Sequence, residues 1–376
     1  MRKVEKIFVI VFFCIICFFL VTTLFNNQKV SWIEQRTLTT FPKFSINNLT
    51  NKKYYDELTN AFSDQLELRE QLIKGYFLFQ FQRYYGTVAI GEDNQMYTAS
   101  QKKVSDSYYD NLVNTIKLVN KESEKISAKF IFLSIPRKDA YMTKELPSNY
   151  NSSKEVYEKQ VRIARDNLGK DIIFIDAYEV FKNNNQYYCY YSNDHHITPR
   201  CAYSLYKEIN NYTQVSSYDL EKEFEIGQTI INGAYNRQVG QKVKHKAEDL
   251  YLIPKTNISY KRYEDEKLSN EKVFGKGNTY EDAYMEGDNA FTRVVTNNNS
   301  KNIMFVGSSY TNILEALSVP SYKEVLSIDY RHNKTGRSIK YYVDKYNIDY
   351  VVFVPAQSNN SYSLDKIKLH LGIINN

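Results

Sequence analysis

The sequence predicts an α/β protein: a parallel sheet with helices on both faces, preceded by an N-terminal membrane anchor and a small helical segment. Short apolar segments of strand length alternate with segments of helical periodicity, and a long apolar run opens the chain. Alternation of this kind is typical of a parallel sheet covered on both faces. With 376 residues, the chain is long enough for one large domain and a smaller one.

The expected strands are short apolar segments, and Pro136 stops the first of them. They cover residues 129–135, 172–175, 302–306, 325–328 and 350–354. Helical stretches are expected at residues 155–167, 199–210, 311–317 and 337–346. Ligands of such sheets bind at the carboxyl ends of the strands, so we expect a site there.

Residues 7–25 form an apolar run interrupted only by two Thr, about the length that crosses a bilayer core. Arg2, Lys3 and Lys6 precede it, and positive flanks stay in the cytoplasm, which places the rest of the chain outside. A cleaved signal peptide is the alternative, but no small-x-small cleavage site follows the run. We expect residues 1–25 to be an uncleaved, single-pass signal anchor in the cell membrane, with an extracellular main domain.

Behind the anchor, we expect two further parts. Residues 26–90 show helical periodicity, as at Leu58 and Phe62, which predicts a small stalk or helical cap. Residues 91–376 hold the α/β domain, in which the polar stretch at about 215–300 breaks the rhythm of strands and helices. We interpret that stretch as an insertion, partly strand and partly loop, and a lid over the site is one interpretation of it.

The composition excludes nucleic acid as a partner, because the net charge of +6 is mild and spread along the chain rather than gathered in a basic stripe. Tyr is abundant, with 34 residues distributed throughout. Bias from an AT-rich genome explains this, and a surface of rings that stack on sugars is the functional alternative.

The first motif with chemical potential runs from Asp194 to Pro199, in a loop that opens a helix. Asp194 and His196 are two residues apart, so both side chains can turn towards one pocket, where the carboxylate orients the imidazole. A capping Asp beside incidental His residues is the alternative. A metal site is a second alternative, but it needs a third ligand that the sequence does not indicate, so we expect no metal.

The second motif is Gly307-Ser308-Ser309-Tyr310, which directly follows an expected strand. A Ser on a tight turn between a strand and a helix projects its hydroxyl at the edge of the sheet, near free backbone N–H groups suited to an oxyanion. An ordinary turn with a Ser N-cap is the alternative. Together, the two motifs form a candidate catalytic triad, because Ser309 needs a base that His196 and Asp194 supply.

Four cysteines are present. Cys14 and Cys17 lie in the apolar run and are interpreted as small hydrophobes. Cys189 and Cys201 bracket the first motif, and an external pair of this kind either forms a disulfide around the motif or remains two buried thiols.

At these residues the chain resembles the DHHW-type proteins of low-GC Gram-positive bacteria, which in turn resemble the alginate O-acetyltransferase group with its SGNH-hydrolase-like fold. The resemblance runs from about Trp32 to the C-terminus. It includes the stretches Glu34-Gln35-Arg36-Thr37-Leu38 with Phe41-Pro42, Phe62-Ser63-Asp64 with Arg69, Ile135-Pro136-Arg137-Lys138, Asp194-His195-His196, Gly307-Ser308-Ser309-Tyr310, Ile328-Asp329-Tyr330-Arg331 and Asp349-Tyr350-Val351-Val352.

The resemblance implies that Asp194, His196 and Ser309 form the triad. It also implies that Arg331 lies near the site and that Tyr310 follows the nucleophile as it does in relatives. We count Tyr310, Arg331 and Ser308 as candidate oxyanion or substrate-binding residues. His195 is expected to be structural.

Two departures from the family pattern stand at the motifs. Ile197 replaces the Trp of the DHHW motif, and Ser308 replaces the Asp of a Gly-Asp-Ser turn. Loss of a carboxylate beside the nucleophile changes the hydrogen bonding and the charge of the turn, which puts full activity in question.

The function that the resemblance implies is O-acetylation of a cell-surface or secreted polysaccharide. It also implies a multipass membrane acyltransferase as the source of acetyl groups, and no cofactor. A carbohydrate acetyl esterase using the same triad is one alternative. A catalytically inactive scaffold or binding subunit of a polysaccharide export and modification complex is the other.

Overall fold

The structure is a computed structural model. It describes residues 3–31, 33–34, 36–45, 48, 50–78, 84–85, 88–98, 104–148, 150–184, 187–241, 243–329, 331–332 and 337–355. Trp32, Gln35 and Tyr330, which belong to the resemblance, lie outside these residues. The chain divides into two compact units, one of residues 1–88 with 234–244 and one of residues 89–233 with 245–376.

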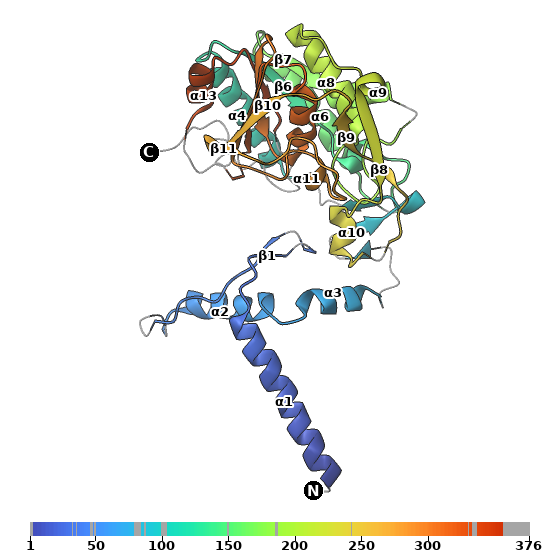
Figure 1. Cartoon of the computed structure of the whole chain (residues 1–376), viewed down its shortest axis with the longest axis vertical. Helices are drawn as coiled ribbons and strands as arrows, with labels where there is room; N and C mark the ends of the chain where they lie inside the picture. Colours follow the sequence, from blue (N-terminus) through green and yellow to red (C-terminus); the bar gives the residue numbers. More distant parts are fainter. Residues whose placement is uncertain are drawn as a thin grey trace. The chain divides into compact units, whose positions relative to one another are not determined.

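The first unit opens with the apolar helix α1 (Lys3–Phe25), which is long and apolar enough to cross a membrane (Figure 1). The other elements of this unit are short. They are the antiparallel strands β1 (Val30–Ser31) and β2 (Arg36–Thr37), the helices α2 (Lys52–Asp64), α3 (Arg69–Leu78) and α10 (Ala234–Gln238), and β3 (Tyr84–Tyr85). The Asn51 side chain caps α2 by accepting a hydrogen bond from the Lys53 N–H.

An eight-stranded sheet forms the centre of the second unit, in the order β11-β10-β12-β14-β13-β15-β6-β7. Its parallel part consists of β14 (Glu324–Asp329), β13 (Asn302–Gly307), β15 (Tyr350–Phe353), β6 (Lys129–Ser134) and β7 (Ile173–Asp176). All five are the strands expected from the sequence, and the apolar runs of β14, β13, β15 and β6 are buried on both faces, as a covered parallel sheet requires, whereas the edge strand β7 is half-buried apart from Ile175.

Helices cover both faces of this sheet, and the side chains of β6 show why. Ile131 and Leu133 point into one apolar cluster, whereas Phe130 and Phe132 point into the other, because successive side chains of a strand face opposite sides. The first cluster is covered by α8 (Pro199–Thr213) and α12 (Asn312–Ser318), and the second by α4 (Asp106–Ser123), α6 (Lys154–Asn167) and α13 (Ile339–Tyr346).

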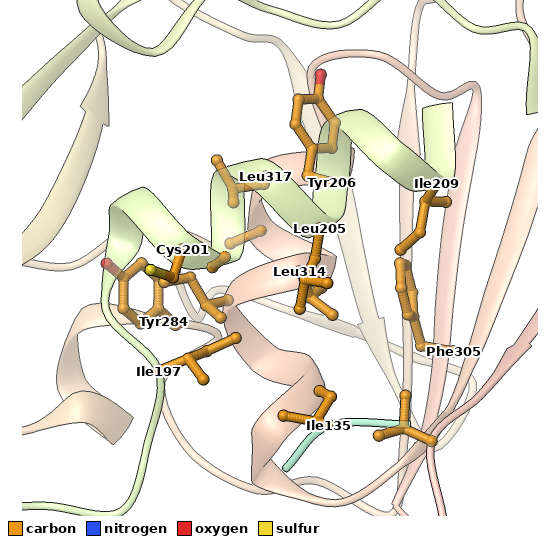
Figure 2. Packing of buried hydrophobic residues seen from close by; sticks show 14 of the residues in the cluster. Ile135, Ile197, Cys201, Leu205, Tyr206, Ile209, Tyr284, Phe305, Leu314 and Leu317 are labelled. Carbon is orange, nitrogen blue, oxygen red and sulfur yellow. The ribbon is translucent and has the colours of Figure 1, made fainter. Parts of the chain in front are cut away.

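The packing of α8 on α12 is visible in Figure 2, where Leu205 and Ile209 of α8 lie close to Leu314 and Phe305. Ile197, which stands at the Trp position of the DHHW motif, is completely buried in the same cluster. The aliphatic side chain therefore serves as core packing at this position.

The stretch at 215–300, which we interpret from the sequence as partly strand and partly loop, contains strands and short helices. In the second unit it contains α9 (Leu220–Glu223), β8 (Phe224–Thr229), β9 (Glu248–Pro254), β10 (Tyr260–Glu264), β11 (Lys267–Ser269), α11 (Tyr280–Ala283) and β12 (Phe291–Thr296). Strand β12 pairs antiparallel with β14, so this stretch extends the main sheet by three strands. The remaining elements of the unit are β4 (Val88–Ile90), η2 (Glu92–Asn94), β5 (Met96–Thr98), α5 (Lys138–Tyr141), α7 (Ala177–Lys182) and η3 (Ser309–Thr311).

Candidate active site

Ser309 lies on a tight turn at the carboxyl end of β13. Ser308 caps the following helical turn through its backbone, because its carbonyl accepts hydrogen bonds from the N–H of Thr311 at 2.8 Å and from the Thr311 hydroxyl at 2.9 Å. Gly307 is required at the start of the turn, since a Cβ there would lie 2.6 Å from Thr311 Cγ2. The turn places Ser309 at the first position of η3, where backbone N–H groups precede the helical ladder.

The loop that carries Asp194 and His196 is closed at its base. Tyr190 and Ile197 form an isolated antiparallel bridge, and the Tyr191 N–H donates to the His196 carbonyl at 3.3 Å. A disulfide joins Cys189 to Cys201, with the two Cα atoms 5.2 Å apart. The loop is therefore held between a strand-like pair and the first turn of α8.

Asp194, His196 and Ser309 meet in one hydrogen-bonded chain. Asp194 Oδ1 lies 2.7 Å from His196 Nδ1 and also accepts the backbone N–H of His196 at 3.0 Å. His196 Nε2 lies 2.9 Å from Ser309 Oγ. The carboxylate thus fixes the Nδ1–H tautomer and leaves Nε2 to accept the Ser309 proton, the arrangement that makes a hydroxyl nucleophilic.

The three residues are nearly closed off from solvent. Ser309 is 4 % exposed, and His196 and Asp194 are each 1 % exposed. Charges that develop in such a site are screened less than in water, so the carboxylate acts strongly on an imidazolium.

Two tyrosines pack against the imidazole of His196. The Tyr280 ring of α11 is stacked on it, with ring centroids 3.8 Å apart and planes inclined by 2°. The Tyr280 hydroxyl accepts the N–H of Ile313 at 3.2 Å, which ties the stacked ring to the helix behind the nucleophile. Tyr310 lies with its ring centroid 5.5 Å from that of His196 and donates its hydroxyl to the His195 carbonyl at 3.0 Å.

The buried amino group of Lys138 supports the loop that carries Asp194. Lys138 is 2 % exposed and donates from Nζ to the carbonyls of Tyr191 at 2.6 Å and Ser192 at 2.8 Å. Glu248 accepts the Ser192 hydroxyl at 2.6 Å and the Ser192 N–H at 3.0 Å. Burial lowers the pKa of Lys138 to about 7 and raises the pKa of Glu248.

A buried carboxyl group lies behind the nucleophile turn. Glu315 Oε1 lies 2.6 Å from Thr311 Oγ1, and the same hydroxyl lies 2.9 Å from the Ser308 carbonyl. Burial raises the pKa of Glu315 to about 7. The Thr311 hydroxyl has one proton and cannot donate to both Glu315 and the Ser308 carbonyl. A protonated Glu315 can donate to the Thr311 hydroxyl, which then donates to the Ser308 carbonyl, so that all three groups are hydrogen-bonded.

Arg331 belongs to a second polar network on the α12 side. It donates from a terminal guanidinium nitrogen to Asp288 Oδ2 at 2.6 Å and pairs with Asp329. The side-chain amide of Asn312 donates to Asp288 Oδ1 at 3.0 Å. Burial acts to raise the pKa of Asp288, but Arg331 and the Asn312 hydrogen bond, together with His196, make the net shift downward. His196 adds to this downward shift, so Asp288 lies within electrostatic reach of the imidazole.

Asp194, His195 and His196 also lie close enough to one another to hold a metal ion, with one ligand atom of each within 4.8 Å of the others. Both ring nitrogens of His196 already lie at hydrogen-bond distance from Asp194 and Ser309. The arrangement therefore fits proton transfer from a serine better than metal ligation.

Solved structures with a similar course of the chain are known. A DHHW family protein from Eubacterium siraeum superimposes with a TM-score of 0.61 at 20% identity, covering 75% of this chain and 94% of its own. Bacillus cereus PatB1 superimposes with a TM-score of 0.57 at 17% identity, covering 74% of this chain and 98% of its own. The same protein with a sulfonyl adduct gives 0.59 at 19% identity, covering 75% and 97%.

This chain has the fold of these proteins. The expected α/β architecture is thereby confirmed, and so is the expected likeness in fold to a DHHW family protein. No family model matches the chain, and no curated protein matches its sequence.

The structure brings the predicted residues Ser309, His196 and Asp194 into contact. Tyr310 packs on the base, and Ser308 contributes its backbone carbonyl to the turn. Arg331 enters the network of Asp288 and Asn312. Sequence reasoning missed Tyr280, Glu248 and Asp288, all from the stretch at 215–300, and it noted Lys138 only as part of a motif without a role. Single residues outside a recognisable motif give no local sequence signal that they belong to a site.

Proposed function

We propose that the chain is an extracytoplasmic O-acetyltransferase that acts on a cell-surface or secreted polysaccharide. The observation that carries the proposal is the hydrogen-bonded chain from Asp194 through His196 to Ser309. The choice of acetyl as the acyl group and of a polysaccharide as the acceptor rests on the resemblance to DHHW-type proteins and the alginate O-acetyltransferase group.

In the first half of the reaction, Ser309 Oγ attacks the carbonyl carbon of an acetyl donor while His196 Nε2 takes the hydroxyl proton. Asp194 stabilises the resulting imidazolium. We assign the backbone N–H groups of Ser309 and Tyr310 to the oxyanion. The intermediate collapses to an acetyl-serine, and His196 returns the proton to the departing donor oxygen.

In the second half, a sugar hydroxyl attacks the acetyl-serine and gives its proton to His196, and Ser309 leaves with that proton. Water in place of the sugar would make the protein an esterase.

We further propose that α1 is retained as a single-pass anchor and that the second unit is extracellular. The positive N-terminus and the apolar helix Lys3–Phe25 support this orientation. The acetyl groups would come from a multipass membrane acyltransferase, as the resemblance implies. This arrangement needs no cofactor, since the acetyl group is carried on Ser309.

The test uses the full-length protein in detergent. A sulfonyl fluoride is expected to label wild type at Ser309, as determined by peptide mass spectrometry, and p-nitrophenyl acetate is expected to be cleaved. Ser309→Ala and His196→Ala should lose both properties. Ser308→Ala is the matched control and should keep both, because Ser308 acts through its backbone carbonyl.

An oligosaccharide acceptor then separates the functions. Acetyl that appears on the sugar with wild type and not with Ser309→Ala supports the transferase. Ester cleavage without any acetylated sugar across varied acceptors contradicts it and supports an esterase. A wild type that matches Ser309→Ala in every assay contradicts the catalytic assignment and supports a scaffold.

A further inference from the structure

The end of the apolar helix α1 is bonded directly to the corner between α2 and α3. The Thr23 hydroxyl, in the last turn of α1, accepts the N–H of Glu67 at 3.2 Å. The Asn26 side chain donates to the Gln65 carbonyl at 3.1 Å. The corner therefore lies within hydrogen-bond distance of the point where α1 ends.

Gln65 makes this joint rigid. It is fully buried, and its side-chain oxygen accepts the N–H of Gln28 at 2.9 Å. Its side-chain amide donates to the carbonyls of Gln28 and Thr39, each at 2.9 Å. Asp64 adds a further contact by accepting the Thr39 N–H at 2.8 Å. The chain that leaves α1 is thus held against the corner on several sides.

Apolar side chains are exposed along the corner and along α3. Leu66 is 38% exposed, Leu68 45%, Leu72 57% and Tyr76 61%. We call these four residues the apolar stripe. Leu72 and Tyr76 are spaced by four residues, so they lie on one face of α3, whereas Leu66 and Leu68 lie in the corner that precedes this helix. Phe25, the last residue of α1, is 84% exposed beside the corner.

The length of α1 fixes the depth of this corner. At 1.5 Å per residue, the span Val4–Phe25 of 22 residues covers roughly 33 Å, close to the hydrocarbon thickness of a bilayer of about 30 Å. Thr23 and Asn26 then lie at the outer interface. Gln65 and Glu67, which are bonded to them, lie at the same depth.

We infer that α3 lies in the outer interface of the bilayer that α1 spans, with the apolar stripe buried at the boundary between the lipid headgroups and the acyl chains. The inference rests on retention of α1 as an anchor and is independent of the proposed chemistry. A helix with exposed apolar residues, held at that depth, removes them from water by lying in the interface plane. The first unit is then both anchored in the membrane and seated on it.

The test uses the full-length chain in lipid nanodiscs of phosphatidylcholine and phosphatidylglycerol. Cys14→Ala and Cys17→Ala leave the disulfide as the remaining cysteine pair, and Leu72→Cys then carries an environment-sensitive NBD probe. Lys74→Cys on the same helix is the matched control, because its side chain is exposed but lies outside the stripe. Both side chains are exposed, and the base of the Lys74 side chain lies near Gly240.

The probe at position 72 is expected to be blue-shifted and quenched several-fold more by lipids with a doxyl group near the headgroup than the probe at position 74. Equal quenching at the two positions overturns the inference. A probe at position 72 that is shielded from water in native membranes but not in nanodiscs also overturns the inference, and it assigns the stripe to a protein partner. Loss of residues 1–25 from the mature chain, seen by intact mass, removes the anchor and refutes it separately.

Discussion

The stack of Tyr280 on His196 leads to a quantitative prediction. When His196 takes the Ser309 proton, an imidazolium forms against the face of a ring whose centroid is 3.8 Å away. A cation over an aromatic face is stabilised by about 2 kcal/mol when both are desolvated, and Tyr280 is 1 % exposed. Because about 1.4 kcal/mol corresponds to a tenfold change in rate, Tyr280→Leu should lower kcat/KM about 30-fold.

Tyr280→Phe is the matched control. It keeps the ring over the imidazole and removes only the hydroxyl that accepts the Ile313 N–H. Its kcat/KM should remain within about threefold of wild type, because the electrostatic face of the ring is retained. Its free energy of unfolding should fall by about 1–3 kcal/mol, since a buried N–H loses its partner.

The assay is hydrolysis of p-nitrophenyl acetate by full-length protein, with chemical denaturation of each variant in parallel. The two variants separate catalysis from stability, because only Leu removes the ring. Full activity in Tyr280→Leu would refute the reasoning. So would a loss in Tyr280→Phe equal to that in Tyr280→Leu, because the effect would then follow from the hydroxyl.

Three further predictions follow from the site. Burial raises the pKa of Glu315 from 4.5 to about 7, so the folded state holds this proton more tightly. The free energy of unfolding, measured by urea denaturation, should fall by about 3 kcal/mol as pH rises from 4.5 to about 7. Glu315→Gln should reduce this dependence on pH. The same dependence on pH in wild type and Glu315→Gln would contradict the prediction. In Asp194→Asn the amide oxygen can still accept both N–H groups of His196, so the main loss is the negative charge. That charge is worth about 4 kcal/mol at an effective dielectric constant near 20, which corresponds to about a thousandfold in kcat/KM. A loss below about tenfold in kcat/KM would argue against the triad. Replacing Cys189 and Cys201 by Ser should lower the free energy of unfolding by about 3 kcal/mol, because the disulfide closes a loop of 12 residues, and an unchanged denaturation midpoint would show that the loop is held without it.

The parallel half of the sheet could be predicted because its signals are local. The run at 129–135 is apolar and ends at Pro136, and the strand observed there, Lys129–Ser134, differs by one residue. The same holds for 302–306, observed as Asn302–Gly307. A strand buried on both faces is recognisable in sequence because nearly all of its residues are apolar.

The antiparallel edge could not be predicted in this way. Strand β12 contains Thr292 and Arg293 among its apolar residues, and it becomes part of the main sheet only through pairing with β14. Arg293 is accommodated there by an ion pair with Glu324 of β14. Such a pairing depends on a partner distant in sequence, which local periodicity does not report.

The site divides in the same manner. Asp194, His196 and Ser309 stand in short motifs with turn residues around them, so their types and spacing were informative. Tyr280 is one of 34 tyrosines, and nothing in its neighbourhood distinguishes it from the others. Lys138 is a buried lysine, and its role becomes visible only with the carbonyls of the loop that it holds.

The order of the site along the chain has a consequence for biogenesis. His196 and Ser309 are separated by 113 positions, and the ring that stacks on the base comes from the segment between them. Contacts at such sequence separation form late in folding, since the entropy of closing the intervening loop must first be overcome. Under the proposed function, a partly folded chain therefore has a serine without its base. The proposed reactivity then arises only when the whole domain has formed, so an immature chain would not react with acyl donors.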